Sequence, residues 1–141
     1  MNSTPARHLL TELDYTVRTY DIDFAGHVSN QVYIRWLEDL RFALLEQYLP
    51  LKPLMDAGTV PLVTETRIKY RKPIQLFEAV HGVMWIEKLE AVRITLVAEI
   101  TVDGEIRAEA TQLGAFVRTV TGLPMRPPET LRRMITPDSQ R

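Results

Sequence analysis

Residues 21–30, with the sequence DIDFAGHVSN, combine the side chains of this chain that are best suited to acyl transfer. Two carboxylates and a histidine lie there, immediately before the expected start of a helix. The first backbone N–H groups of a helix have no intrahelical acceptor, and the helix dipole makes that end electropositive. A developing oxyanion can therefore be stabilised at the helix start, and an adjacent carboxylate completes the requirements of an acyl-transfer site.

The same stretch has two other interpretations besides the catalytic one. Asp, Gly and Ser also gather in turns and helix caps for purely local reasons, so a structural turn remains an alternative. A calcium-binding EF-hand loop is excluded. Asp21, Asp23 and Gly26 match its first, third and sixth positions, but Ala25 and Val32 stand at the fifth and twelfth, where ligands are required.

Other catalytic classes find little support in the sequence. The absence of cysteine excludes a disulfide framework, a thiolate nucleophile and every cysteine-containing zinc site. His8, His27 and His81 lack metal-like spacing, so we expect no metal. Ser29 lies two residues from His27, but nothing indicates a third group to orient that pair, which argues against a serine hydrolase.

Length and composition predict one globular domain. The 141 residues, of which 45% are hydrophobic and 25% charged, suit a single domain over residues 1–141 with short flexible tails at both ends. A net charge of -1 provides no global field for nucleic acid. No apolar run approaches the roughly 20 residues of a membrane span, and the first residues lack the apolar core of a signal peptide. We therefore expect a cytoplasmic protein.

A long helix must follow the candidate site. Residues 30–49 contain no Gly or Pro, Ser29 or Asn30 would cap the helix, and Pro50 would end it. Its apolar stripe consists of Tyr33, Trp36, Leu37, Leu40, Leu44 and Tyr48. Ile34, Phe42 and Leu45 lie off that stripe, which predicts burial on more than one side.

The pattern of the remaining chain is typical of strands. The expected strands are residues 15–20, 60–70, 76–88, 92–102 and 105–120, with a two-residue hairpin at Asp103-Gly104. Strands in succession need only hairpins, so we expect an α+β fold in which a meander-like antiparallel sheet of about five strands wraps around one helix. Residues 129–135 are expected to form a short surface helix.

Residues 19–33, followed by Glu38 and Arg41, resemble the signature of the hotdog-fold thioesterases of the 4-hydroxybenzoyl-CoA thioesterase type. The resemblance covers most of the chain, because the element order and the break at residues 70–73 also fit. It implies a hotdog fold and hydrolysis of an acyl thioester, carried by coenzyme A or acyl carrier protein, to free acid and thiol. No cofactor is implied, since coenzyme A is part of the substrate.

The resemblance also implies roles for residues near the helix start. Asp23 would be the nucleophile or general base, and the backbone N–H of Asn30 would polarise the thioester carbonyl, in agreement with the interpretation from the residues. His27 would shape the loop or line the pocket. Tyr33 matches a family tyrosine near the site but also belongs to the apolar stripe.

Substrate contacts are expected from the strand that follows the helix. Glu65 resembles a second carboxylate of plant and cyanobacterial-type relatives, which assists from the neighbouring subunit. Arg71 and Lys72, with Lys69, would meet the phosphates of coenzyme A or the acidic face of acyl carrier protein. The family's paired arginines after the third strand are absent, because residues 88–91 are KLEA.

Two alternative functions accompany thioester hydrolysis. A hotdog hydratase uses Asp-x-Asn-Pro-x-His, whereas Asp23 and His27 are only four apart and lack the Asn-Pro. A non-catalytic acyl or pantetheine binding module is the other alternative. The open sheet edge predicts an obligate homodimer that assembles further into a homotetramer, and the resemblance implies that the site lies between two subunits.

Overall fold

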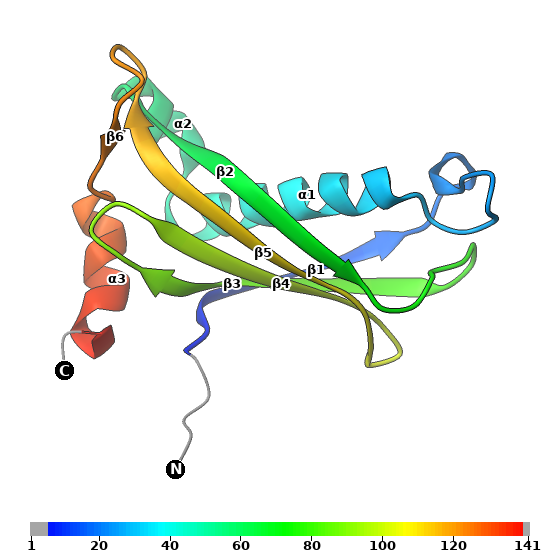
Figure 1. The fold of residues 1–141 in the computed structure, drawn as a ribbon. Helices are drawn as coiled ribbons and strands as arrows, with labels where there is room; N and C mark the ends of the chain where they lie inside the picture. The colour runs from blue at the N-terminus through cyan, green and yellow to red at the C-terminus, as the bar shows by residue number, and fades with distance from the viewer. Residues whose placement is uncertain (1–5, 140–141) are drawn as a thin grey trace.

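The computed structural model describes residues 6–139, with side chains as far as Ile135, so the two predicted tails lie mostly outside the described residues. Its strands are β1 (His8–Thr16), β2 (Thr59–Tyr70), β3 (Ala79–Leu89), β4 (Ile94–Val102), β5 (Glu105–Arg118) and β6 (Pro124–Met125). Its helices are the 3-10 turn η1 (Thr19–Asp21), α1 (Asn30–Tyr48), α2 (Leu51–Asp56) and α3 (Glu129–Ser139). One long helix lies along the concave face of an antiparallel sheet, as predicted (Figure 1).

The strand order is β1-β3-β4-β5-β2, with β6 paired to β5. The strands β3, β4 and β5 form the expected meander, but the expected hairpin between β2 and β3 is wrong. The connection of residues 71–78 instead crosses the end of the sheet, and β2 forms the edge beside β5. Ile74 explains the difference, because it is fully buried and its carbonyl accepts the Val28 N–H at 2.8 Å.

The first strand is β1, so the prediction of a strand at residues 15–20 is wrong. Glu12 and Asp14 point away from α1, and their carboxylates contact the two ring nitrogens of His81 on β3 at 2.9 and 2.8 Å. Because these outward residues are acidic, the segment resembles a loop when the sequence is considered alone. Their contacts raise the pKa of His81 above its ordinary value, through the bond to Asp14 first and then that to Glu12.

Beyond β1 the chain turns instead of extending. The side chain of Asp21 is buried, and its Oδ2 accepts the backbone N–H of Arg18 at 2.8 Å. This bond closes the turn η1 and brings the chain back toward α1. The residues that seemed β-prone by type therefore form a turn because a buried carboxylate satisfies their backbone.

The helix α1 begins and ends as predicted. Ser29 is its N-cap, with Oγ accepting the Gln31 N–H at 3.3 Å, and Pro50 separates it from the unpredicted α2. Most of the predicted stripe is buried, while Tyr48 is partly buried. Burial on a second side is not observed, since Ile34 and Phe42 are 45% and 53% exposed. The sheet ends at β2 and covers only one side of the helix.

Two further elements complete the fold. Asp103 and Gly104 have φ values of 50° and 78°, which confirms the predicted two-residue hairpin. The helix α3 is longer than predicted and is not purely superficial, because Leu131 and Ile135 are 3% and 1% exposed and belong to the core. No helix in the described part of the chain is long and apolar enough to cross a membrane.

Candidate functional site

The loop of residues 22–29 holds Asp23 in a tight turn. The Asp23 N–H donates to the His27 carbonyl and the Gly26 N–H donates to the Asp23 carbonyl, both at 3.0 Å. The Asp23 carboxylate accepts the Ala25 N–H through Oδ1 at 2.9 Å. Within residues 6–139 no hydrogen bond engages Oδ2. One carboxylate oxygen therefore orders the loop while the other remains available.

The loop is fixed to the rest of the fold at its end. The Ser29 N–H donates to the Asp21 carbonyl and the Val28 N–H to the Ile74 carbonyl, each at 2.8 Å. Asp21 itself lies 3.5 Å from a guanidinium nitrogen of Arg35. These contacts set the position from which α1 begins, and thus the direction of its first backbone donors.

Asn30 supplies the first N–H of α1. Ser29 satisfies the next two, through Oγ for Gln31 and through its carbonyl for Val32 at 2.9 Å. Among the described residues none accepts a hydrogen bond from the Asn30 N–H. An unused donor at the positive end of a helix, with the carboxylate of Asp23 on the preceding loop, is suited to stabilise charge on a carbonyl oxygen.

His27 and Tyr33 lie close to this loop in different ways. The carbonyl of His27 closes the loop, and its half-buried side chain forms no hydrogen bond or ion pair with the described residues. Tyr33 is buried beneath the helix start, and its ring packs against Trp36 and Tyr70 at centroid distances of 5.4 and 5.1 Å. Burial raises the pKa of Tyr33 to about 12. Tyr33 thus belongs to the core under the site.

The end of β2 also meets the helix start. The Tyr70 hydroxyl donates to the Asn30 carbonyl at 3.4 Å. Arg71 forms an ion pair with Glu109, and Lys72 lies 3.4 Å from Glu105, while both remain exposed. These two cations are therefore located at the same end of the molecule as Asp23.

Glu65 is not brought to Asp23 within one chain. It lies five residues before Tyr70 on β2, about 17 Å away along the strand. Its carboxylate lies 3.7 Å from Arg67. Arg41, on α1, donates to Gln112 on β5 at 3.0 Å.

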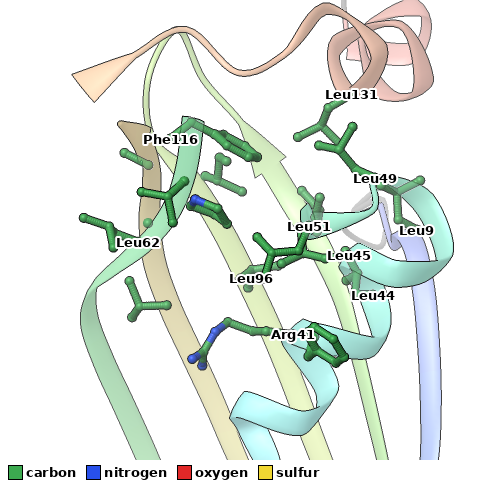
Figure 2. A pocket seen from close by; sticks show the side chains of 18 of the residues that line it. Leu9, Arg41, Leu44, Leu45, Leu49, Leu51, Leu62, Leu96, Phe116 and Leu131 are labelled. Atoms are coloured by element: carbon green, nitrogen blue, oxygen red, sulfur yellow. The ribbon is translucent and has the colours of Figure 1, made fainter. Parts of the chain in front are cut away.

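A cavity of about 670 Å³ opens between the C-terminal half of α1 and the strands β2, β4 and β5. Leu44, Leu45 and Leu49 line one side, and Leu96 and Phe116 face them (Figure 2). Arg41 extends from α1 at its lower end, beside the apolar part. The lining suits a hydrocarbon chain.

Sequence reasoning missed Arg107 and Glu78. Arg107 is 7% exposed and binds Glu78 through two guanidinium nitrogens at 3.1 and 2.8 Å. The only signal in the sequence was an arginine placed between the apolar residues Ile106 and Ala108. The described part of the chain contains no group of three or more His, Asp or Glu side chains that could hold a metal ion.

Comparison with solved structures shows the same fold. A thioesterase complexed with coenzyme A and zinc from Thermus thermophilus is 24% identical, with a TM-score of 0.78 over 95% of this chain and 96% of that one. A 1,4-dihydroxy-2-naphthoyl-CoA thioesterase from Synechocystis is 16% identical, with a TM-score of 0.80 over 90% and 96%. A DHNA-CoA thioesterase from Staphylococcus aureus is 21% identical, with a TM-score of 0.77 over 93% and 87%. The predicted hotdog fold is confirmed.

The family assignment comes from the sequence comparison. No curated protein sequence matches the chain. The family model of the thioesterase-like superfamily matches residues 17–135, which include the Asp23 loop, α1 and the sheet from β2 to β6. The chain therefore belongs to the thioesterase-like superfamily and is a thioester hydrolase.

Proposed function

We propose that this protein hydrolyses acyl thioesters of coenzyme A or acyl carrier protein, with Asp23 as nucleophile or general base. The observation that carries the proposal is the free Oδ2 of Asp23 on a loop that leads directly to the unused Asn30 N–H. As general base, Asp23 takes a proton from the water that attacks the acyl carbon, the C–S bond breaks, and that proton passes to the departing thiolate. As nucleophile, the carboxylate displaces the thiolate to form an acyl anhydride, which water then hydrolyses to the free acid and regenerates Asp23, while the proton released from water passes to the thiolate. The Asn30 N–H would stabilise the negative charge that develops on the carbonyl oxygen.

The apolar cavity supports an aliphatic acyl group, and a panel of thioesters tests the function. With coenzyme A as carrier, we expect kcat/KM to rise as an aliphatic chain lengthens to fill the cavity, because each buried methylene contributes about 0.8 kcal/mol. The same acyl groups on acyl carrier protein identify the carrier. Absence of hydrolysis across the whole panel, with acyl-CoA still bound, would favour the non-catalytic binding module.

The cavity and Asp23 lie toward opposite ends of α1, which supports a dimeric site. Asn30 and Leu45 are 15 residues apart, about 22 Å along the helix. The strand β2 is a sheet edge that runs antiparallel to α1, with Tyr70 at the helix start and Val60 near the cavity. Antiparallel pairing of β2 with a second copy would bring the cavity of one chain beside the Asp23 loop of the other.

We therefore expect a homodimer, able to assemble further into a tetramer, in solution. Pairing through β2 would satisfy the open edge and cover the exposed Ile34 and Phe42 of α1. Light scattering at micromolar concentration checks this expectation. A stable monomer that retains full activity would contradict both the assembly and the shared site.

The basic group of Lys69, Arg71 and Lys72 is proposed to bind the carrier and not to act in chemistry. All three side chains are exposed, and Arg71 and Lys72 directly follow β2 at the helix start. Replacement of each by Glu should raise KM about tenfold and reduce its salt dependence, with kcat nearly unchanged. Arg133→Glu, an exposed cation on α3 away from the β2 edge, is the control. An unchanged KM for both carriers would make the group an ordinary solvated surface.

A further inference from the structure

Arg107 joins the β2 to β3 connection to the sheet through an unusually dense set of contacts. Its guanidinium donates to the Pro73 carbonyl at 2.7 Å and to both carboxylate oxygens of Glu78. Its own carbonyl accepts the N–H groups of Arg71 and Lys72 at 2.8 and 3.2 Å. One residue of β5 therefore holds the connection near its beginning, middle and end.

The same connection holds the Asp23 loop. Ile74 follows Pro73 directly, is fully buried, and accepts the Val28 N–H at 2.8 Å. Val28 is 4% exposed and precedes the helix cap by one residue. A continuous chain of bonded groups thus runs from the Arg107 guanidinium to the backbone that begins α1.

The ion pair lies close to the helix start, because Arg107 binds the backbone of Arg71 and Lys72, which directly follow Tyr70, and Tyr70 donates to the Asn30 carbonyl. Arg107 and Glu78 both influence the pKa of Tyr33, which is raised mainly by burial, and Tyr33 packs against Tyr70. Glu78 holds the pKa of Arg107 above its usual range, and Arg107 holds that of Glu78 below. Both directions favour the ionised forms, so each group stabilises the charge of the other.

We propose that Arg107 and Glu78 are positioning residues, which set the place of the Asp23 loop and the Asn30 N–H by holding the connection of residues 71–78. This inference rests on the proposed function. A mutation remote from the reacting atoms that displaces a catalytic group by about 1 Å can lower the rate by about 10²-fold. The series of hydrogen bonds from Arg107 through the connection to Val28 is a direct route by which such a displacement would reach the Asp23 loop.

Glu105 provides a matched control for Glu78. It also binds Arg107, through Nε at 2.7 Å, but it belongs to the start of β5 and reaches the connection only through the exposed side chain of Lys72. Glu78→Gln and Glu105→Gln each remove one negative partner of the same guanidinium. Only Glu78→Gln weakens a contact between Arg107 and the connection of residues 71–78.

The test measures steady-state kinetics and amide hydrogen exchange of Val28 well below the unfolding midpoint of each variant. We expect Arg107→Lys and Glu78→Gln to lower kcat about tenfold or more with little change in KM, and to speed Val28 exchange about tenfold. Lysine keeps the charge but replaces the planar fork with one ammonium group. Glu105→Gln should leave both quantities within about twofold of the wild type.

A fall in kcat with Val28 exchange unchanged, or equal effects of Glu78→Gln and Glu105→Gln, would contradict the proposed positioning role of Arg107 and Glu78. Lower unfolding midpoints with unchanged kcat and exchange would show that the pair only stabilises the fold. If Arg107→Lys does not fold, the comparison of Glu78→Gln with Glu105→Gln still tests the positioning role. If the wild type hydrolyses no thioester, the proposed function fails, while the exchange measurement still tests the mechanical link.

Discussion

Asp23→Asn should lower turnover by roughly 10² to 10⁴, the range expected for loss of a nucleophile or general base. Asparagine retains an oxygen in the place of Oδ1, so it can still accept the Ala25 N–H that orders the loop at 2.9 Å. Substrate binding and the fold should survive, and only the negative charge is lost. Kinetics with the best thioester of the panel, together with circular dichroism of the variant, check this result.

Asn30→Ala is the matched control, because it keeps the backbone N–H that the mechanism uses. The helix cap is Ser29, and the Asn30 side chain is exposed, so the substitution should change kcat little. Ser29→Ala removes the capping oxygen and should cost about 1 kcal/mol of stability. If folded Asp23→Asn retains turnover within about tenfold of the wild type, Asp23 is not catalytic and the loop has a binding role.

Gly114→Ala should destabilise the fold by overpacking the contact between β2 and β5. A Cβ at this position would lie 2.6 Å from the Leu62 carbonyl oxygen, a backbone atom of β2 that cannot move without shifting the strand. Gly114 pairs with Val63, where the register of β2 and β5 becomes irregular before Glu65. Overpacking of this kind typically costs about 1–3 kcal/mol and can cost more against backbone.

Chemical denaturation of Gly114→Ala checks this expectation, with Ala115→Gly as its control. The control alters the neighbouring position of the same strand without introducing a clash, and glycine in a strand costs about 0.5–1 kcal/mol. A smaller loss for Gly114→Ala than for the control would mean that β2 adapts freely. Because Gly114 and Leu62 both line the cavity, the response to long acyl chains should change together with stability.

Some of the architecture could be predicted because it depends on neighbours within a few residues. The apolar stripe of α1, its Ser29 cap and its end before Pro50 follow from helical spacing and capping. The positive φ values at Asp103 and Gly104 follow from the turn that joins β4 to β5. The location of Asp23 immediately before a helix start was predictable for the same local reason.

Other features depend on residues far apart in the chain, and spacing alone does not reveal them. The acidic outward face of β1 is explained by His81, 67 residues after Asp14. The place of β2 at the sheet edge follows from the burial of Ile74 over the helix start, where a hairpin had been expected. The separation of Glu65 from Asp23 within one chain follows from that topology.

The sequence by itself determined which residues form the helix, the meander strands and the loop that carries Asp23, because local hydrogen bonding and periodic burial select these structures. Only the tertiary structure decided that Arg107 and Glu78 support that loop, and that the apolar cavity opens at the other end of α1. The free energy of such contacts depends on which surfaces meet after the sheet closes around the helix. Residue spacing along the chain does not reveal which of these surfaces come into contact.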